Sequence, residues 1–142
     1  MVASNRNILM RAFFDTNVYI NAFFKKVLPR AEFEKLFSLY DIVVCPVVKH
    51  ELLLGTIHKK TRKELEQFFD QCPLLEAPTK KMWEEMTERM QSLKWRENRQ
   101  QNDLLIALTA REEQAALITY DGHFQKIKPW VDFELVLLSE SA

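Results

Sequence analysis

The sequence predicts an α/β protein with a parallel sheet that helices cover on both faces. Short apolar or β-branched runs alternate along the chain with segments whose apolar residues recur at helical spacing. This alternation is typical of parallel strands, because each pair needs a long crossover connection. A chain of 142 residues, 47% of them hydrophobic, is large enough for one domain with its own core.

The predicted strands are short apolar runs, each bounded by polar residues or by proline. In chain order they cover 8–14, 41–45, 73–75, 115–120 and 133–138. The first strand ends at the polar cluster that begins with Asp15, and Pro46 halts the second. The run over 73–75 is the briefest of them.

The predicted helices are segments with apolar residues three and four positions apart. They cover 18–24, 30–39, 47–58, 61–71, 79–93 and 103–114. Pro29 is typical of a helix start, and Thr61 with Glu64 matches a capping pattern. Asn102 is placed to cap the last helix, after a charged loop over 94–101 that we expect to be mobile.

Composition excludes several classes of protein. The net charge is zero, from 20 basic and 20 acidic residues, so any nucleic-acid site must be local. The longest apolar stretches are far shorter than the roughly 20 residues that cross a membrane. The first residues lack the order of a secretion signal, and the two cysteines form no zinc motif. We therefore expect a cytoplasmic protein with no membrane segment.

Four carboxylates are placed differently from the acidic runs of ordinary solvated helix faces. Asp15 follows the first strand, Asp121 follows the strand over 115–120, Glu51 lies early in the helix after the second strand, and Asp103 opens the last helix. Each one alone has an ordinary explanation as a turn or helix-start residue. Together they belong at one edge of a parallel sheet, where α/β proteins bind ligands.

Clustered carboxylates repel one another, so they stay ionised together only when cations neutralise them. An all-oxygen donor set suits Mg²⁺ or Mn²⁺, which commonly binds substrate phosphates as well. A metal of this kind lowers the pKa of a bound water, and a second ion about 4 Å away stabilises a leaving oxygen. The carboxylates therefore predict phosphoryl chemistry.

Each of the four acids lies in a short polar and apolar motif. The motifs are Phe14-Asp15-Thr16-Asn17-Val18, His50-Glu51-Leu52, Asn102-Asp103-Leu104-Leu105-Ile106-Ala107 and Thr119-Tyr120-Asp121-Gly122-His123-Phe124. In their order and spacing these segments resemble the signatures of the PIN-domain family. The resemblance covers the chain from about Met10, and the most similar group is the VapC-like toxins of bacterial and archaeal toxin–antitoxin pairs.

This resemblance implies a three-layer α/β/α sandwich with about five parallel strands. It also implies a Mg²⁺- or Mn²⁺-dependent endoribonuclease that acts as a toxin, forms homodimers and is inhibited by a cognate antitoxin. The domain would span 10–142, after an N-terminal extension over 1–9 that is either disordered or added in cloning. A non-catalytic PIN-like module that binds RNA or protein is the alternative.

The resemblance also implies roles for individual residues. Asp15, Glu51, Asp103 and Asp121 are expected to be the metal and catalytic carboxylates. Asn17 and Thr119 flank the acids, and we expect them to orient carboxylates or waters by hydrogen bonding, with helix cap and strand-end hydroxyl as ordinary alternatives. His50 has no fixed counterpart in the family, so an exposed helix histidine is its ordinary interpretation and a contact to phosphate the other.

The basic segment just before Asp103 is the candidate RNA contact. It supplies cations for phosphates and an indole that can stack on an unpaired base of a structured, single-stranded or loop RNA. Its members are Lys94, Trp95, Arg96 and Arg99. The aromatic residues over 18–39 either form ordinary core or line a groove for a partner protein.

A phosphatase of the haloacid-dehalogenase kind also carries an Asp after its first strand. It needs a second Asp two residues later, and this chain has Asn17 there. The sequence therefore favours the ribonuclease over this second enzyme class.

Overall fold

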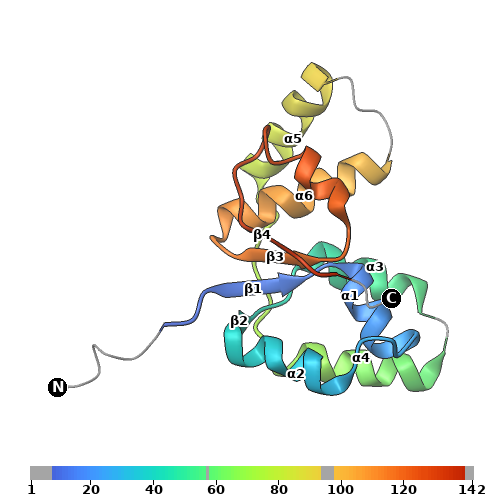
Figure 1. Cartoon of the computed structure of the whole chain (residues 1–142). Coiled ribbons are helices and arrows are strands. Elements are labelled where there is room, and N and C mark those ends of the chain that lie inside the picture. Colours follow the sequence, from blue (N-terminus) through green and yellow to red (C-terminus); the bar gives the residue numbers. More distant parts are fainter. Residues whose placement is uncertain (1–7, 57, 94–97, 140–142) are drawn as a thin grey trace.

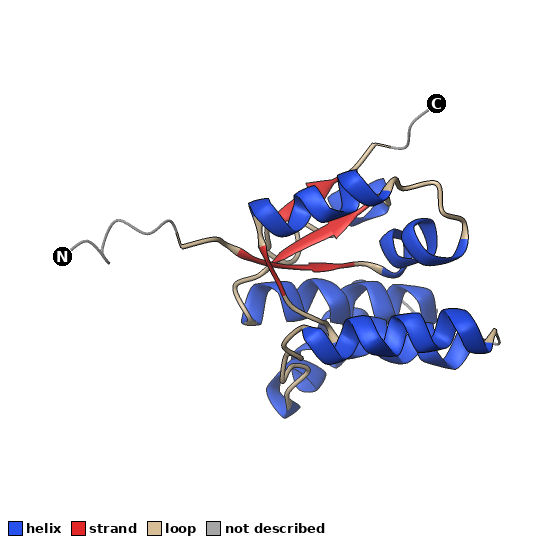
Figure 2. Cartoon of the chain, turned by 90° about the horizontal axis from the view of Figure 1, so that it is seen from below, coloured by secondary structure: helices blue, strands red, loops and turns tan. Residues whose placement is uncertain are grey.

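The computed structural model describes residues 8–56, 58–93 and 98–139. Its centre is a parallel sheet of four strands in the order β2-β1-β3-β4. The inner strands are β1 (Arg11–Phe14) and β3 (Ala116–Thr119), and the outer ones are β2 (Asp41–Ile42) and β4 (Leu135–Leu137). The strands are rotated relative to one another, as the natural twist of a sheet requires (Figure 2).

Helices cover both faces of this sheet, which confirms the predicted α/β class and its three layers. In Figure 1, α5 and α6 lie over one face and α2 and α4 under the other, while α1 and α3 lie at the end where β1 points. The helices are α1 (Thr16–Tyr19), α2 (Arg30–Leu39), α3 (Pro46–Gly55), α4 (Lys59–Gln71), α5 (Lys80–Leu93) and α6 (Asn98–Glu112). Within the described residues, none of them is long and apolar enough to cross a membrane.

The count of about five strands is corrected to four within the described residues. The run over 73–75 makes only an isolated parallel bridge, between Val44 and Leu74. Its two hydrogen bonds join Val44 N–H to the Pro73 carbonyl (2.8 Å) and Leu75 N–H to the Val44 carbonyl (2.9 Å). The ladder stops there because Pro73 has no N–H to donate and Pro46 already begins α3.

Two predicted helix starts are also wrong. α4 begins at Lys59 rather than at Thr61, and α6 begins at Asn98, so Asn102 lies inside α6 and does not cap it. In both cases residues upstream of the capping side chain continue the helix, which tertiary packing permits. The consequence for Asp103 is direct, because its carboxylate lies beyond the helix's first turn.

The pairing of β1 with β3 sets which residues meet at the carboxyl end of the sheet. Phe14 pairs with Ile118, and the Asp15 N–H donates to the Ile118 carbonyl (2.9 Å). One step further along both strands, Asp15 therefore lies opposite Thr119. Both inner strands are almost fully buried, so their register is fixed by packing on both faces.

An aromatic cluster fills the space between the sheet and helices α2 and α4. Phe33 contacts Phe14, Phe37 and Phe68 with ring centroids 5.2 to 5.9 Å apart, and Tyr19 contacts Phe68 at 5.5 Å. Aromatic pairs at these distances add about 0.5–1.5 kcal/mol each beyond simple burial. Most of the aromatic side chains over 18–39 are therefore core.

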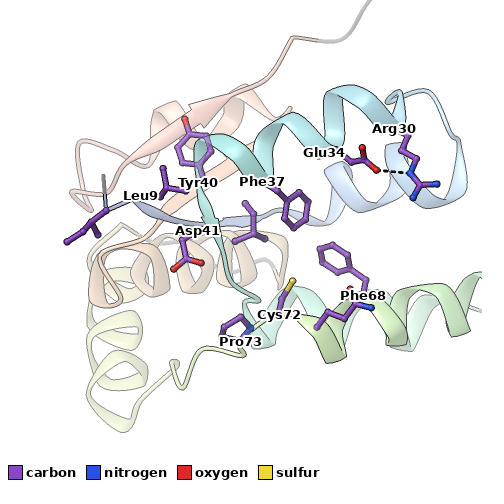
Figure 3. Close-up of a pocket in the computed structure, with 12 residues that line it drawn as sticks. Leu9, Arg30, Glu34, Phe37, Tyr40, Asp41, Phe68, Cys72 and Pro73 are labelled. Carbon is purple, nitrogen blue, oxygen red and sulfur yellow. Dashed lines mark hydrogen bonds and ion pairs between the residues drawn. The ribbon is translucent and has the colours of Figure 1, made fainter. Parts of the chain in front are cut away.

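The cluster has one open edge, shown in Figure 3. Phe37 from α2 and Phe68 from α4 line a pocket of about 770 Å³, with Arg30 and Glu34 at one end and Asp41 at the other. Phe37 is 36% exposed. The sequence left two interpretations open for these aromatic residues, an ordinary core or a groove. The inner rings of the cluster are core, and the rings at its rim line a groove.

A charged network joins α5 to α6 on the opposite face. Glu85 accepts two hydrogen bonds from the Arg111 guanidinium, both at 2.7 Å, and a third from Arg89 at 2.8 Å. These bonds from Arg111 first, and from Arg89, lower the pKa of Glu85 from 4.5 to about 2. The Glu85 side chain is only 23% exposed, so this bidentate pair is worth more than a solvated ion pair.

We expect Glu85→Gln to lower the free energy of unfolding by about 2 kcal/mol at pH 7, because Arg111 and Arg89 lose a shared charged acceptor. The Glu85 pKa is depressed in the folded state, so its contribution is present above pH 4.5 and is lost as the pH falls toward about 2. Urea unfolding at pH 7 and pH 3 measures both effects.

Glu84→Gln is the matched control for this prediction, since Glu84 is exposed on the same helix. The control should unfold like the wild-type protein at both pH values. An equal loss of stability at pH 7 and pH 3 in Glu85→Gln would contradict the assigned pKa.

Candidate active site

Asp15 begins the site, directly after β1. It is the N-cap of α1, and its Oδ1 accepts a hydrogen bond from the Thr16 backbone N–H (2.8 Å). Its Oδ2 accepts from the hydroxyl of Thr119 (2.8 Å), which lies at the end of the neighbouring strand β3. Asn17 donates through Nδ2 to Thr119 Oγ1 (3.1 Å) and to Asp15 Oδ2 (3.4 Å). Asp15, only 7% exposed, is thus held in one orientation.

Asp121 lies two residues after β3, at the start of the 3-10 turn η3 (Gly122–Lys126). Its Oδ1 accepts from the His123 N–H (2.8 Å), and its own N–H donates to Thr119 Oγ1 (3.0 Å). Asn17 Oδ1 accepts from the Tyr120 N–H (3.2 Å), which fixes the same turn against α1. Asp121 is therefore both a turn residue and a neighbour of Asp15, so its two interpretations are compatible.

Glu51 and Asp103 reach this edge from two helices, α3 and α6. The negative charges of Asp15 and Asp103 both raise the pKa of Glu51, so the Glu51 carboxylate lies near both of them. Both Glu51 and Asp103 are half-buried. Because Asp103 lies inside α6, the favourable interaction of an acid with a helix start does not explain it.

Burial and repulsion shift the titration of these acids in the same direction. Burial raises the pKa of Asp15, hydrogen bonds from Thr119 and Thr16 lower it, and the charge of Asp121 raises it again. Burial also raises the pKa of Glu51, with Asp15 and Asp103 next and with His50 and Thr16 opposing. The net direction is upward for both, so ionising these carboxylates together costs free energy in the protein alone.

The donor atoms fit a hard divalent cation. Glu51 Oε1 is buried and has no hydrogen-bond partner within the described residues. Cys45 lies near Asp15 and Glu51, but burial first and then these charges raise the pKa of its thiol to about 11, so it is no thiolate donor. The remaining donors are carboxylate oxygens, which suit Mg²⁺ or Mn²⁺.

In the described part of the chain, no three His, Cys, Asp or Glu side chains form a ready-made metal cage. Mg²⁺ does not need one, because it keeps several waters and binds through one or two carboxylates together with substrate phosphates. The acids here lie near enough in space to repel one another, and this arrangement fits such an open site.

The structure leaves some sequence-predicted contacts untested. Lys94, Trp95 and Arg96 lie outside the described residues, and Arg99 lies in the first turn of α6. His50 is exposed on α3. The sequence indicated no role for Thr16, whose backbone N–H donates to Asp15 Oδ1. The only available signal was its position directly after Asp15.

Known structures share this fold over nearly the whole chain. VapBC-1 from nontypeable Haemophilus influenzae matches with a TM-score of 0.69 and 24% identity, over 90% of this chain and 98% of that chain. VapBC2 from Rickettsia felis, bound to a DNA fragment from their promoter, matches with a TM-score of 0.70 and 22% identity, over 92% of this chain and 100% of that chain. VapBC-5 from Mycobacterium tuberculosis matches with a TM-score of 0.55 and 17% identity, over 91% of this chain and 99% of that chain.

No curated protein sequence matches this chain. The family model of the PIN domain, however, matches residues 12–128. That match begins in β1 and ends beyond η3, so it contains all four carboxylates of the site. The chain therefore belongs to the PIN-domain family.

Proposed function

We propose that this protein is an endoribonuclease that depends on Mg²⁺ or Mn²⁺ and acts as the toxin of a toxin–antitoxin pair. The main support is the electrostatic coupling of four acids that come from four elements. The charge of Asp121 raises the pKa of Asp15, and the charges of Asp15 and Asp103 raise the pKa of Glu51. Buried repelling acids are costly unless a cation binds them. Membership of the PIN-domain family supports a nuclease.

One or two carboxylates of the group Asp15, Asp103 and Glu51 would hold the metal together with waters and substrate phosphates, and Asp121 would be a further acid close to Asp15. When bound, it supplies Lewis acidity and lowers the pKa of a water that attacks the phosphodiester. The protein's own part is orientation. Thr119 and the Thr16 N–H fix both oxygens of Asp15, and Asn17 ties this carboxylate to the Asp121 turn. Such outer partners commonly change metal affinity or activity about 10- to 100-fold.

The assignment as a toxin with an antitoxin partner is supported by the similar structures, which are VapBC assemblies and complexes. The groove between Phe37 and Phe68 offers a half-exposed aromatic surface with charged ends for such a partner (Figure 3). We also propose a homodimer in the cytoplasm. Expression with and without the protein encoded by the adjacent reading frame tests the pairing, since growth arrest should occur only without it.

A non-catalytic module that binds RNA or protein is the second candidate. It has the same fold, but it does not account for the burial and mutual repulsion that raise the pKa values of Asp15 and Glu51. The cleavage experiment separates the two.

We expect the purified protein to cleave structured RNA in the presence of Mg²⁺ or Mn²⁺, and we expect EDTA to abolish this cleavage. Asp103→Asn should lower the rate by at least about 100-fold, since even outer partners of a metal site reach that effect. Glu112→Gln, at an exposed position on the same helix, is the matched control and should cleave at the wild-type rate. Denaturing gels of labelled RNA measure the products.

Two results would contradict this proposal in different ways. Cleavage that survives EDTA and Asp103→Asn would exclude the metal and carboxylate mechanism. No cleavage of any RNA, with folded protein, would favour the binding module.

We expect Glu51→Gln to raise the melting temperature by about 3 °C in EDTA at pH 7, because it removes a partly buried charge that Asp15 and Asp103 repel. The Glu51 pKa is raised in the folded state, so its ionisation destabilises the fold above that pKa. The difference from wild type should vanish once the pH falls below 4.5, where both side chains are neutral.

Saturating Mg²⁺ should stabilise the wild-type protein more than the variant, because binding to the folded state alone shifts its stability. Scanning calorimetry in EDTA and in Mg²⁺ measures both effects, with Glu84→Gln as a neutral control on α5. A lower melting temperature for Glu51→Gln in EDTA would refute the repulsion.

A further inference from the structure

A second recess is lined by Tyr120, the residue before Asp121, and has no role in the proposed chemistry. It has a volume of about 260 Å³, and its wall mixes an apolar side with charged and polar groups. The groups that matter here are Asn21, Lys25, Leu28, Glu32, Tyr120 and Ser139. They come from the end of the α1 region, the first turn of α2, and the segments after β3 and β4.

An unusual piece of backbone builds this recess. After α1 the chain continues as a π-helical turn, η2 (Ile20–Phe24), which the Lys25 N–H closes on the Ile20 carbonyl (2.8 Å). Lys26 then adopts a left-handed φ of 55°, and the Asn21 carbonyl accepts from Val27 (2.9 Å) and Leu28 (3.1 Å). Such π turns and left-handed non-glycine residues often occur at functional sites.

The recess begins where the carboxylate network ends. Tyr120 lines it, and the N–H of the same residue donates to Asn17 Oδ1 (3.2 Å). Asn17 in turn bonds to Asp15, while Asn21 follows one helical turn later and faces the recess. A chain of hydrogen bonds from Asp15 through Asn17 to Tyr120 therefore connects the carboxylates to the wall of the recess.

We propose that the recess takes one unpaired nucleoside of the RNA, next to the phosphodiester that is cleaved, with guanosine preferred. The Tyr120 ring and Leu28 give the base an aromatic and an apolar surface. The Glu32 carboxylate accepts the adjacent N1–H and N2–H groups that only guanine presents side by side. Lys25 neutralises a flanking phosphate. This inference rests on the proposed ribonuclease function.

The chemistry of the wall argues against a simple phosphate site. Glu32 would repel a second phosphate, whereas an acidic acceptor beside an apolar wall suits the Watson–Crick edge of a base that carries amino and imino donors. Uracil and its two carbonyls would bring oxygen atoms against that carboxylate. The recess is thus expected to set the sequence preference while the four acids set the rate.

The test is binding of fluorescein-labelled hexaribonucleotides by fluorescence anisotropy, in Mg²⁺ and in an Asp103→Asn background. We expect UUGUUU to bind about tenfold more tightly than UUUUUU, since a good pair of hydrogen bonds discriminates by about 1–3 kcal/mol. Glu32→Gln should reduce this ratio to about threefold or less. Lys25→Ala should weaken both oligonucleotides equally.

Glu34→Gln is the matched control. Glu34 lies on the same helix, but its carboxylate accepts a hydrogen bond from Arg30 Nε (2.8 Å) and lines the groove with Phe37 and Phe68 instead of the recess. It should leave the ratio unchanged. Glu32 and Lys25 are exposed, so both variants should fold, and their thermal unfolding checks this. A tenfold ratio that persists in Glu32→Gln, or equal binding of both hexamers by the parent, would overturn the guanosine pocket.

This outcome is independent of cleavage. RNA cleavage with no effect of Glu32 on binding would leave the nuclease intact and remove the pocket. Glu32-dependent binding without cleavage by the wild-type protein would support the pocket and contradict the nuclease.

Discussion

The parallel pairing of β1 with β3 is the constraint on which the candidate active site depends. Because Phe14 pairs with Ile118, the next residues on the two strands are Asp15 and Thr119. The Thr119 hydroxyl therefore donates a hydrogen bond to the Asp15 carboxylate. A shift of one residue would turn every side chain of a strand to the other face of the sheet. The apolar packing of two nearly buried strands thus determines where the first acid of the site stands.

The site opposes folding, and other parts of the structure compensate. Burial and mutual repulsion raise the pKa values of Asp15 and Glu51, so their ionised forms weaken the protein in the absence of a cation. The aromatic cluster under the sheet and the bond between Glu85 and Arg111 act in the opposite direction. The Glu85 network also holds α6, the helix that carries Asp103, against α5.

Hydrophobic periodicity predicted most of the fold, including the helix over 30–39 with both of its ends. The capping signal failed at α6. Asn102 has a side chain typical of a helix cap, but the helix begins four residues earlier, at Asn98, so Asn102 lies inside it. Sequence order also predicted that the four acids share an edge. The resemblance predicted that Thr119 orients a carboxylate or a water by hydrogen bonding. It did not identify Asp15, 104 positions away, as the partner, because that contact depends on the register. Nor did it predict the recess at Tyr120, which a π turn and the left-handed Lys26 create.

The anomalous difference map of crystals grown with saturating Mn²⁺ tests directly whether the carboxylates bind a metal. We expect a manganese peak at the carboxyl edge of β1, with oxygens of Asp15 and Asp103 at about 2.0–2.3 Å, the range for hard divalent cations on oxygen ligands. Manganese bound elsewhere, or no peak beside these acids at saturating Mn²⁺, would contradict the assignment of the four carboxylates to a metal site.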